Sequence, residues 1–275
     1  MQNSASNSKK LKPVISIIPF LNAKPLTYFF EKNKHDNFEI SHNFPSECIE
    51  KLKAGEVDAG IVSTIAIATV PNTEVVDGIC IASHSSVESV VLFSDKPVEK
   101  IETIGLDPNS GTSNALIRII MEKWKNKKCT YKPYFQDIET ALNSGEFDGV
   151  LAIGDRALSF GIENPSMIAM DLALEWNHYT GLPFVFAMWL VRKNSGLNPE
   201  LFREYGEKGI NSIDKIIAET NLVHNSELNK FQITKYLKEN LHYRFGPKER
   251  KGLMLFLKYC AEAGLIPENY TLKLI

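Results

Sequence analysis

The chain has 275 residues, of which 44% are hydrophobic and 23% are charged, and its formal net charge is −2. These values are typical of a globular protein with a substantial core, built as one large domain or two modest ones. The nearly balanced charge gives no indication of a surface that binds polyanions. We therefore expect no nucleic-acid partner and no membrane contact.

The N-terminus and the cysteines favour a reducing compartment. The start, MQNSASNSKKLKP, is polar and basic, and the apolar run VISIIPFL behind it is too short for a membrane span. No secretory signal is indicated, so we expect a cytoplasmic location. The four cysteines, at 48, 80, 129 and 260, lie far apart without a CxxC pair, which favours apolar fillers over metal or redox centres.

In chain order, the first part alternates short apolar runs with amphipathic helical patterns. It predicts a strand at 14–18, a helix at 25–31, a strand at 38–44, a helix from 45 to 55, and strands at 59–62, 73–82 and 87–95. The next part repeats this order, with a strand at 101–107, a helix at 110–124, a strand at 129–135, a helix ending at 145 and a strand at 149–153. The apolar run at 184–192 predicts another long strand, and the chain after Pro199 is helical in pattern.

One phrase occurs twice, as GEVDAGIVS at 55–63 and as GEFDGVLAI at 145–153. In each copy a Gly follows an amphipathic helix, where it favours a left-handed helix stop. An Asp and a short apolar run follow, as expected of a strand buried on both faces of a parallel sheet. The repeat therefore predicts an α/β protein with two lobes of similar build.

A chain that runs from lobe one to lobe two and back to lobe one must cross between the lobes twice. We expect the first near 90–95 and the second near 185–190, which makes a clamshell with two crossing strands as its hinge. Lobe one would comprise residues 1–95 and 188–275, including the C-terminal helices, and lobe two residues 96–187. Ligands of such sheets bind at the carboxyl ends of the strands, so the facing ends define one cleft.

Two of the loops at these strand ends carry candidate binding groups. Asn22 lies between Pro19 and Pro25 in IPFLNAKPL, where it is either a turn residue or a hydrogen-bond partner of a ligand. In DPNSGTSNAL, the residues Ser110, Thr112 and Ser113 stand at a helix start, which is either an anion site or a simple N-cap. Neither a P-loop nor GxGxxG is present, so no nucleotide is implied.

The loop SHSSVESV, at 83–90, offers hydroxyls and titratable groups. Ser86 and Ser89 could donate to a carboxylate, and His84 or Glu88 could act as an acid or base, although each could equally be a solvated surface residue.

The fourth loop is AIGDRAL, at 152–158. Here Gly154 and Asp155 follow the second copy of the repeat, where the first copy has Ser63 and Thr64. For Asp155 we favour the role of N-cap for a helix that starts at Arg156.

Other sequence patterns that carry known chemistry are absent: there is no GxSxG, no HExxH and no Cys with a convincing His partner. The histidines, at 35, 42, 84, 178, 224 and 242, are spread singly, so we expect no metal site and no cofactor.

The order of these segments resembles a known family. IPFLNAKPL, SVESVVLFS, LDPNSGTSNAL, GEFDGVLAIGDRAL and DLALEWNHYTGLPFVFAMW, together with the helical tail ITKYLKENLHYRFGPKERKGLMLFLKYCAEAGLI, are similar to the MqnA family over residues 13–267. These are the chorismate dehydratases of the futalosine route to menaquinone. The resemblance implies the two-lobed, type 2 fold of periplasmic solute-binding proteins.

The resemblance also implies the reaction, which is loss of water from chorismate to give 3-[(1-carboxyvinyl)oxy]benzoate. No convincing side-chain base stands in the cleft loops, so we hypothesise that the enolpyruvyl carboxylate of the substrate removes the ring proton. Asn22 and Ser89 would then orient the reacting groups as the catalytic pair, and the helix start at Ser110 would hold a carboxylate. Ser63, Ser86, Gly154 and Asp155 complete the expected substrate-binding set.

Alternatives remain at this point. His84 could be the base, and SHSS differs from the Gly-containing segment usual in the family, which puts Ser86 in doubt. The chain could instead be the related 1,4-dihydroxy-6-naphthoate synthase, a non-catalytic small-acid binding protein or the sensing domain of a transcription regulator. A regulator would need a DNA-binding helix-turn-helix, normally at the N-terminus, and we expect none in the polar residues before the first predicted strand. We expect a monomer or weak homodimer with chorismate as its small-molecule partner.

Overall fold

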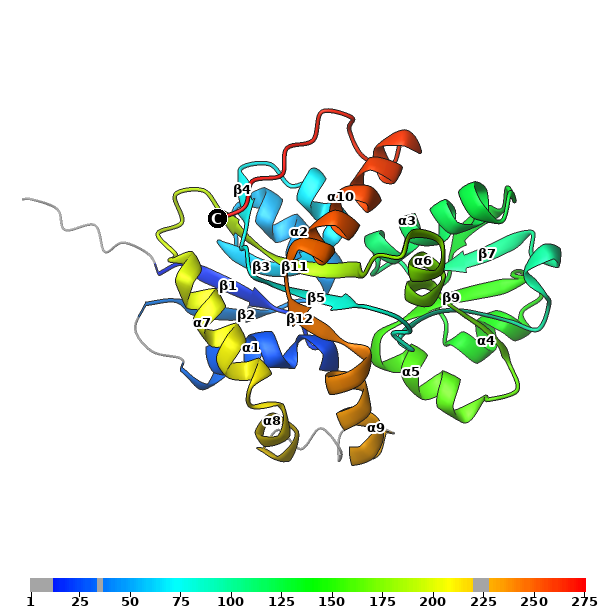
Figure 1. Ribbon diagram of the computed structural model, residues 1–275, viewed down its shortest axis with the longest axis horizontal. Helices are drawn as coiled ribbons and strands as arrows, with labels where there is room; N and C mark the ends of the chain where they lie inside the picture. The colour runs from blue at the N-terminus through cyan, green and yellow to red at the C-terminus, as the bar shows by residue number, and fades with distance from the viewer. Residues whose placement is uncertain (1–11, 34–36, 220–227) are drawn as a thin grey trace, which may run out of the picture.

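The structure is a computed structural model that describes residues 12–33, 37–219 and 228–275 of the chain. It has two lobes, each built around one sheet with helices packed on it (Figure 1). The strand order is β12-β5-β11-β3-β1-β2 in the first sheet, where β4 also pairs with β11, and β10-β6-β9-β7-β8 in the second.

Lobe one is drawn from both ends of the chain. Its strands are β1 (Val14–Ile17), β2 (Glu39–His42), β3 (Ala59–Ser63), β4 (Thr73–Val75), β5 (Ile79–Ser83), β11 (Phe184–Arg192) and β12 (His242–Arg244). Its helices are α1 (Lys24–Lys32), α2 (Pro45–Ala54), α7 (Pro199–Ile210), α8 (Ile213–Glu219), α9 (Lys230–Lys235) and α10 (Pro247–Glu262), with short turns η1 (Leu21–Ala23), η2 (Thr64–Ala68) and η5 (Tyr236–Asn240). Trp189 of β11 is fully buried between Phe30 and Phe202, which anchors α1 and α7 to this sheet.

Lobe two is continuous in sequence. Its strands are β6 (Val90–Ser94), β7 (Thr103–Leu106), β8 (Thr130–Pro133), β9 (Gly149–Ile153) and β10 (Ile168–Asp171). Its helices are α3 (Gly111–Ile119), α4 (Ile138–Asn143), α5 (Gly154–Glu163) and α6 (Leu172–Thr180), with short turns η3 (Val98–Lys100) and η4 (Ile120–Trp124). A separate core forms here around Phe93, Tyr134 and Phe147.

The repeated phrase has the same structure in both lobes. Gly55 ends α2 with φ +79°, and Gly145, one residue beyond the cap of α4, has φ +73°, conformations that favour glycine. The Asp of each copy holds the start of the neighbouring parallel strand. Asp58 accepts from the Val14 amide at 2.9 Å, and Asp148 accepts from the Thr103 amide at 2.9 Å. The predicted helix-to-strand return is therefore confirmed in both copies.

The equivalence extends to the strand order. In lobe one β1 is parallel to β2 and β3, and β11 is antiparallel to β3. In lobe two β7 is parallel to β8 and β9, and β6 is antiparallel to β9. Each lobe is thus completed by an antiparallel strand that lies immediately after a crossing.

The crossings differ from the expected positions. The segment predicted as a strand at 87–95 begins only at Val90 and belongs to lobe two, while β11 pairs with lobe-one strands. Sheet membership changes between Ser83 and Val90 and again between Asp171 and Phe184, whereas the sequence interpretation divided the lobes at 95/96 and 187/188. The crossing segments are residues 84–89, called the first crossing below, and residues 181–183, the second crossing.

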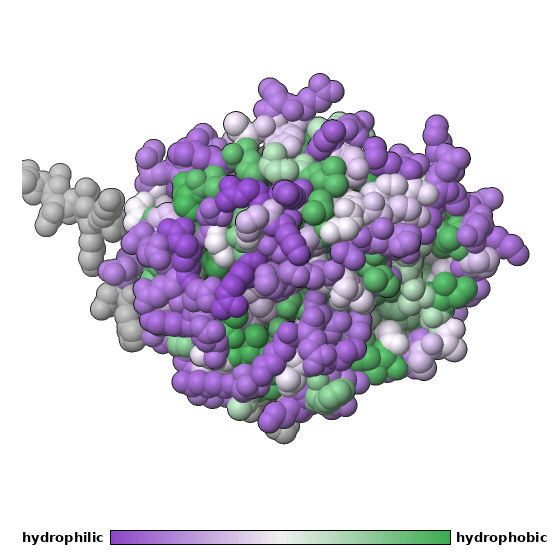
Figure 2. All heavy atoms as spheres, viewed as in Figure 1, coloured by the Kyte–Doolittle hydropathy of each residue, from purple (hydrophilic) through white to green (hydrophobic). Residues whose placement is uncertain are grey.

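The region after Pro199 is not wholly helical, because β12 pairs with β5 at the edge of the first sheet. The sequence pattern does not indicate this strand because β12 has only three residues. The exterior in Figure 2 is mostly hydrophilic, with hydrophobic side chains in small groups. Among the described residues, no helix combines the length and the apolar character needed to cross a membrane.

Candidate active site

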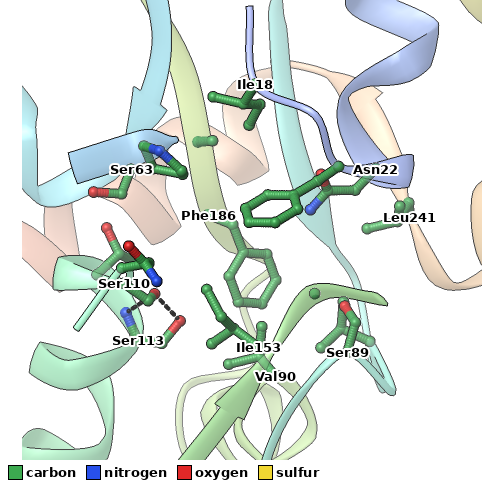
Figure 3. A pocket seen from close by; sticks show the side chains of 17 residues that line it. Ile18, Asn22, Ser63, Ser89, Val90, Ser110, Ser113, Ile153, Phe186 and Leu241 are labelled. Atoms are coloured by element: carbon green, nitrogen blue, oxygen red, sulfur yellow. Dashed lines mark hydrogen bonds between the residues drawn. The ribbon is translucent and has the colours of Figure 1, made fainter. Parts of the chain in front are cut away.

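A cavity lies between the lobes at the carboxyl ends of the strands, the place expected for a ligand in this architecture. Seven of the nine residues predicted for the site line it: Asn22, Ser63, Ser89, Ser110, Thr112, Ser113 and Gly154. Phe186, from β11, stands among them with Ile18 and Ile153, so the cavity combines apolar walls with a few polar groups (Figure 3). This composition is typical of small-molecule sites.

The lobe-one wall carries two polar atoms without partners. Asn22 lies in η1 just after β1, and Ser63 is the last residue of β3. Asn22 Oδ1 and Ser63 Oγ are both buried and have no hydrogen-bond partner in the described part of the chain. Since a buried polar atom is normally hydrogen-bonded, these two atoms mark where a ligand could bind.

The lobe-two wall is the start of α3. Ser110 is the N-cap, because its hydroxyl accepts from the Ser113 amide at 3.2 Å, and it also donates to the Ser113 hydroxyl at 2.7 Å. The N-cap interpretation is therefore confirmed, and the same residues face the cavity. The Thr112 hydroxyl accepts from the Ile65 amide of lobe one at 3.0 Å, which ties the two walls together.

Ser89 reaches the cavity from the first crossing and has a partner that sequence reasoning missed. The Tyr236 hydroxyl donates to Ser89 Oγ at 2.8 Å. Tyr236 is 1% exposed, and burial raises the pKa of its hydroxyl, so it is a donor at neutral pH. It belongs to the C-terminal segment, far from Ser89 in sequence, and only its position within the family-like tail could have signalled it.

Ser86 does not line the cavity. Its hydroxyl donates to Asp171 Oδ2 at 2.7 Å, and the amides of Val87 and Glu88 donate to the same oxygen at 2.9 and 2.7 Å. Glu88 has φ +61°, unusual for a residue other than glycine, and pairs with Lys235 at 2.6 Å. Ser86 therefore shapes the first crossing, and the expected direct contact with a ligand at this position has no support in the geometry.

Asp155 is not an N-cap, because α5 begins at Gly154 and Ile153 occupies the cap position. Its carboxylate instead accepts from the Leu21 amide of lobe one, at 3.3 Å to each oxygen. Burial raises the pKa of Asp155 to about 6. It lies at the neighbouring opening between the lobes with Arg156, whose guanidinium pairs with Asp107 at 2.8 Å.

Two helix dipoles contribute to the electrostatics of the cavity. No Lys, Arg, His, Asp or Glu is among its lining residues in the described ranges. The N-termini of α3 and α5, at Gly111 and Gly154, lie at its wall, and such helix ends favour negative charge. A small organic anion is therefore the class of ligand that suits this cavity best.

The fold also joins residues that were expected to lie apart. His84, at the start of the first crossing, contacts Glu249 of α10 with Nε2 2.7 Å from Oε1, and the ring of His242 lies 4.3 Å from that of His84. The interpretation that the histidines form no cluster is therefore wrong for this pair. His35 and His224 lie outside the described residues. His84 does not line the cavity.

Comparison with known proteins gives the family. A family model described as "Menaquinone biosynthesis" matches residues 13–262. The chain belongs to the menaquinone-biosynthesis family. A chorismate dehydratase from Campylobacter jejuni is 27% identical over 253 residues, covering 90% of this chain and 97% of the relative. One from Thermus thermophilus is 26% identical over 270 residues, covering 90% and 94%. The resemblance to the MqnA family is thereby confirmed.

Solved structures confirm the fold of this menaquinone-biosynthesis protein. A crystal structure of a protein from Archaeoglobus fulgidus superposes with a TM-score of 0.74 at 16% identity and covers 93% of this chain and 98% of that one. The alkanesulfonate-binding protein SsuA from Xanthomonas axonopodis superposes with a TM-score of 0.64 at 14% identity and covers 94% and 95%. The periplasmic-binding-protein-like clamshell predicted from the sequence is therefore correct.

Proposed function

We propose that this chain is a chorismate dehydratase, which removes water from chorismate to give 3-[(1-carboxyvinyl)oxy]benzoate. The observation that carries the proposal is a cavity between the lobes that has helix N-termini and hydroxyls but no charged side chain. Chorismate has two carboxylates and a ring hydroxyl, which match such donors. The two dehydratase relatives support the same reaction.

The reaction needs few catalytic side chains. One ring proton leaves, the electron pair of its C–H bond forms the new ring double bond, and the hydroxyl on the adjacent carbon departs and takes up this proton, which gives one molecule of water. Because the product ring is aromatic, the reaction is strongly downhill. No Asp, Glu or His lines the cavity in the described chain, which supports the hypothesis that the enolpyruvyl carboxylate of the substrate takes the proton.

The protein would then act by orientation. Asn22, in lobe one, and Ser89, in the first crossing, would position the reacting groups, with Tyr236 fixing the Ser89 hydroxyl. The start of α3, at Ser110, Thr112 and Ser113, would hold one carboxylate through hydroxyls and the helix N-terminus. Ser63 and Gly154 would complete the contacts, and Asp155 would act indirectly through its bond to the Leu21 amide, which precedes Asn22.

The test is to incubate the purified chain with chorismate and to follow a product that is lighter by one water by mass spectrometry. We expect turnover, and we expect Asn22→Ala and Ser89→Ala to lower kcat/KM by about a hundredfold or more. Asn143→Ala is the matched control, because Asn143 is exposed on α4 and does not line the cavity. Its rate should equal that of the unmodified chain.

The outcomes separate the alternatives. Tight chorismate binding without product would indicate a small-acid binding protein, and neither binding nor product would favour the related naphthoate synthase. Both results contradict the proposal. A chorismate analogue with the enolpyruvyl carboxylate esterified tests the base: the ester should bind and stay unchanged, and its conversion would point to a base on the protein.

A further inference from the structure

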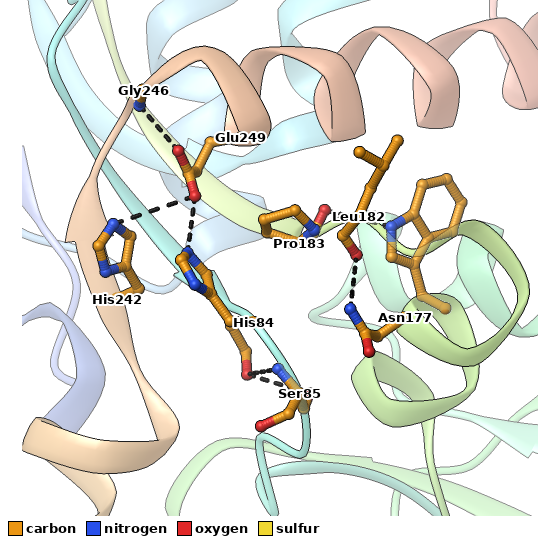
Figure 4. A network of polar contacts seen from close by, with 10 residues as sticks. His84, Ser85, Asn177, Leu182, Pro183, His242, Gly246 and Glu249 are labelled. Atoms are coloured by element: carbon orange, nitrogen blue, oxygen red, sulfur yellow. Dashed lines mark hydrogen bonds and ion pairs between the residues drawn. The ribbon is translucent and has the colours of Figure 1, made fainter.

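Three side chains with metal-ligating atoms meet beside the first crossing, away from the cavity. His84 follows β5, His242 is the first residue of β12, and Glu249 lies in the first turn of α10. Figure 4 shows the carboxylate of Glu249 facing both imidazole rings. One nitrogen from each ring and one carboxylate oxygen all lie within 4.8 Å of one another.

The spacing suits a small tetrahedral ion. Zn²⁺ with ligand bonds of about 2.0–2.1 Å sets its ligand atoms roughly 3.3 Å apart. Glu249 Oε1 lies 2.7 Å from His84 Nε2 and 4.0 Å from His242 Nε2, so the observed separations lie on either side of that value.

The surroundings hold these ligands in place. Glu249 Oε2 accepts from the Gly246 amide at 2.9 Å, which leaves Oε1 facing the histidines. His242 is fixed by the pairing of β12 with β5, opposite Ala82. Glu249 has a side chain only 5% exposed, whereas that of His84 is 49% exposed, so solvent can reach the cluster from one side and supply a fourth ligand.

We propose that His84, His242 and Glu249 form a binding site for a divalent transition metal ion such as Zn²⁺. Two imidazoles, one carboxylate and water are a ligand set that zinc accepts. A simple ion pair would need only one of the two histidines, whereas the centroid of the second ring lies 4.3 Å from that of the first, with the rings tilted by 43°, and the second ring faces the same carboxylate.

The position gives the ion a mechanical effect. His84 begins the first crossing, and Glu249 lies one helical turn before Gly252, which packs against the carbonyl of Pro183 in the second crossing. Helix α10 therefore contacts both crossings. A metal ion between His84 and Glu249 ties the first crossing to this helix and stiffens the hinge at a site separate from the substrate cavity.

The experiment titrates the untagged, EDTA-treated full chain with Zn²⁺ by calorimetry and with Co²⁺ by visible absorption. We expect one ion per chain and a tetrahedral Co²⁺ spectrum. His84→Gln and His242→Gln should each weaken metal binding by about a hundredfold or more. Loss of a group that only hydrogen-bonds to a metal ligand already lowers metal affinity by about ten- to a hundredfold, and loss of the ligand itself should lower it further. The control His178→Gln alters an exposed histidine on α6 and should bind as the unmodified chain does.

Stoichiometric binding that survives in both His84→Gln and His242→Gln would overturn the proposal, as would the absence of one-to-one binding in the unmodified chain. If a variant fails to fold, anomalous scattering at the zinc edge from crystals of the unmodified chain decides. A peak between the two rings and Glu249 supports the site, and a peak only elsewhere refutes it.

Discussion

Two oxygens, Asn22 Oδ1 and Ser63 Oγ, are buried at the cavity wall without a partner among the described residues. An unpaired buried polar group costs about 1–3 kcal/mol of stability. The free protein therefore carries this cost at the cavity, and a ligand that hydrogen-bonds to these atoms relieves it. Such a site rejects analogues that lack the matching groups.

This predicts an unusual result for Ser63→Ala. Because the hydroxyl has no partner to lose in the described part of the chain, the free energy of unfolding should stay the same or rise by up to about 1 kcal/mol, while KM for chorismate rises by about tenfold. Urea unfolding and steady-state kinetics measure the two effects. Ser94→Ala is the control, because the buried Ser94 hydroxyl donates to the Asp148 carbonyl at 2.6 Å and its loss should destabilise the chain. Equal destabilisation by both changes would contradict this account.

Asp155 predicts a pH dependence of stability. Burial raises the pKa of its carboxyl from 3.8 to about 6, so the folded chain binds this proton more tightly than the unfolded chain does. The stabilisation by this proton is complete below about pH 4 and is lost as the pH rises through 6. Asp155→Asn should therefore be more stable than the unmodified chain at pH 7, on the order of 2 kcal/mol, and equally stable near pH 4. Thermal melts across this range measure the difference, and a difference independent of pH would refute it.

At the scale of elements, one carboxylate of lobe two holds the first crossing. Asp171 Oδ2 accepts three hydrogen bonds from residues 86–88, and Oδ1 caps α6 through the amides of Ala173 and Leu174. A helix cap alone contributes about 1 kcal/mol. The remaining bonds give Asp171 a second function, which is to hold the crossing that carries Ser89.

Asp171→Ala should lower the free energy of unfolding by about 3 kcal/mol and reduce kcat through Ser89. Asp137→Ala is the matched control, since Asp137 caps α4 through the Thr140 amide at 2.8 Å and touches no crossing. The control should lose about 1 kcal/mol and keep its activity. The two variants are compared by urea unfolding and by turnover, and equal losses would show that the crossing gains nothing from Asp171.

The elements near each strand end could be predicted from the sequence because local patterns determine them. The repeated Gly and Asp give the helix-to-strand return in both lobes, and the resulting edge of each sheet brings Asn22, Ser63 and Ser110 to one cavity. Asp155 was misread because a helix can begin one residue earlier, at a Gly with φ +68°.

Long-range pairings could not be predicted in the same way. Tyr236 meets Ser89, and Glu249 meets His84, only because β12 returns to pair with β5. A three-residue strand has no periodicity to recognise, so nothing in the sequence brings the C-terminal segment to the first crossing. The true positions of the crossings depend on the same tertiary pairings.

At the scale of the whole molecule, the lobes contact each other across the cavity. The Leu21 amide donates to Asp155 and the Ile65 amide to Thr112, both from lobe one to lobe two. If ligand binding favours the closed arrangement, these amides should exchange with deuterium more slowly when 3-[(1-carboxyvinyl)oxy]benzoate is added. The Val14 amide, bonded within lobe one to Asp58, is the internal control and should not change. Unchanged exchange at Leu21 and Ile65 would contradict ligand-driven closure.

The first crossing is held from both lobes at once. Lobe two binds it through Asp171, and lobe one through Lys235, Tyr236 and Asn240, which bond to Glu88, Ser89 and the Ser86 carbonyl respectively. If the two lobes move apart at the first crossing, the hydrogen bonds to one lobe must break. We therefore expect lobe opening to be a discrete step with a barrier rather than gradual flexing. Ser89 is bonded to Tyr236 and also lines the cavity, so a ligand that hydrogen-bonds to Ser89 would compete with this contact. On the proposed function, in which Ser89 orients the substrate, we expect product release to depend on this same hydroxyl.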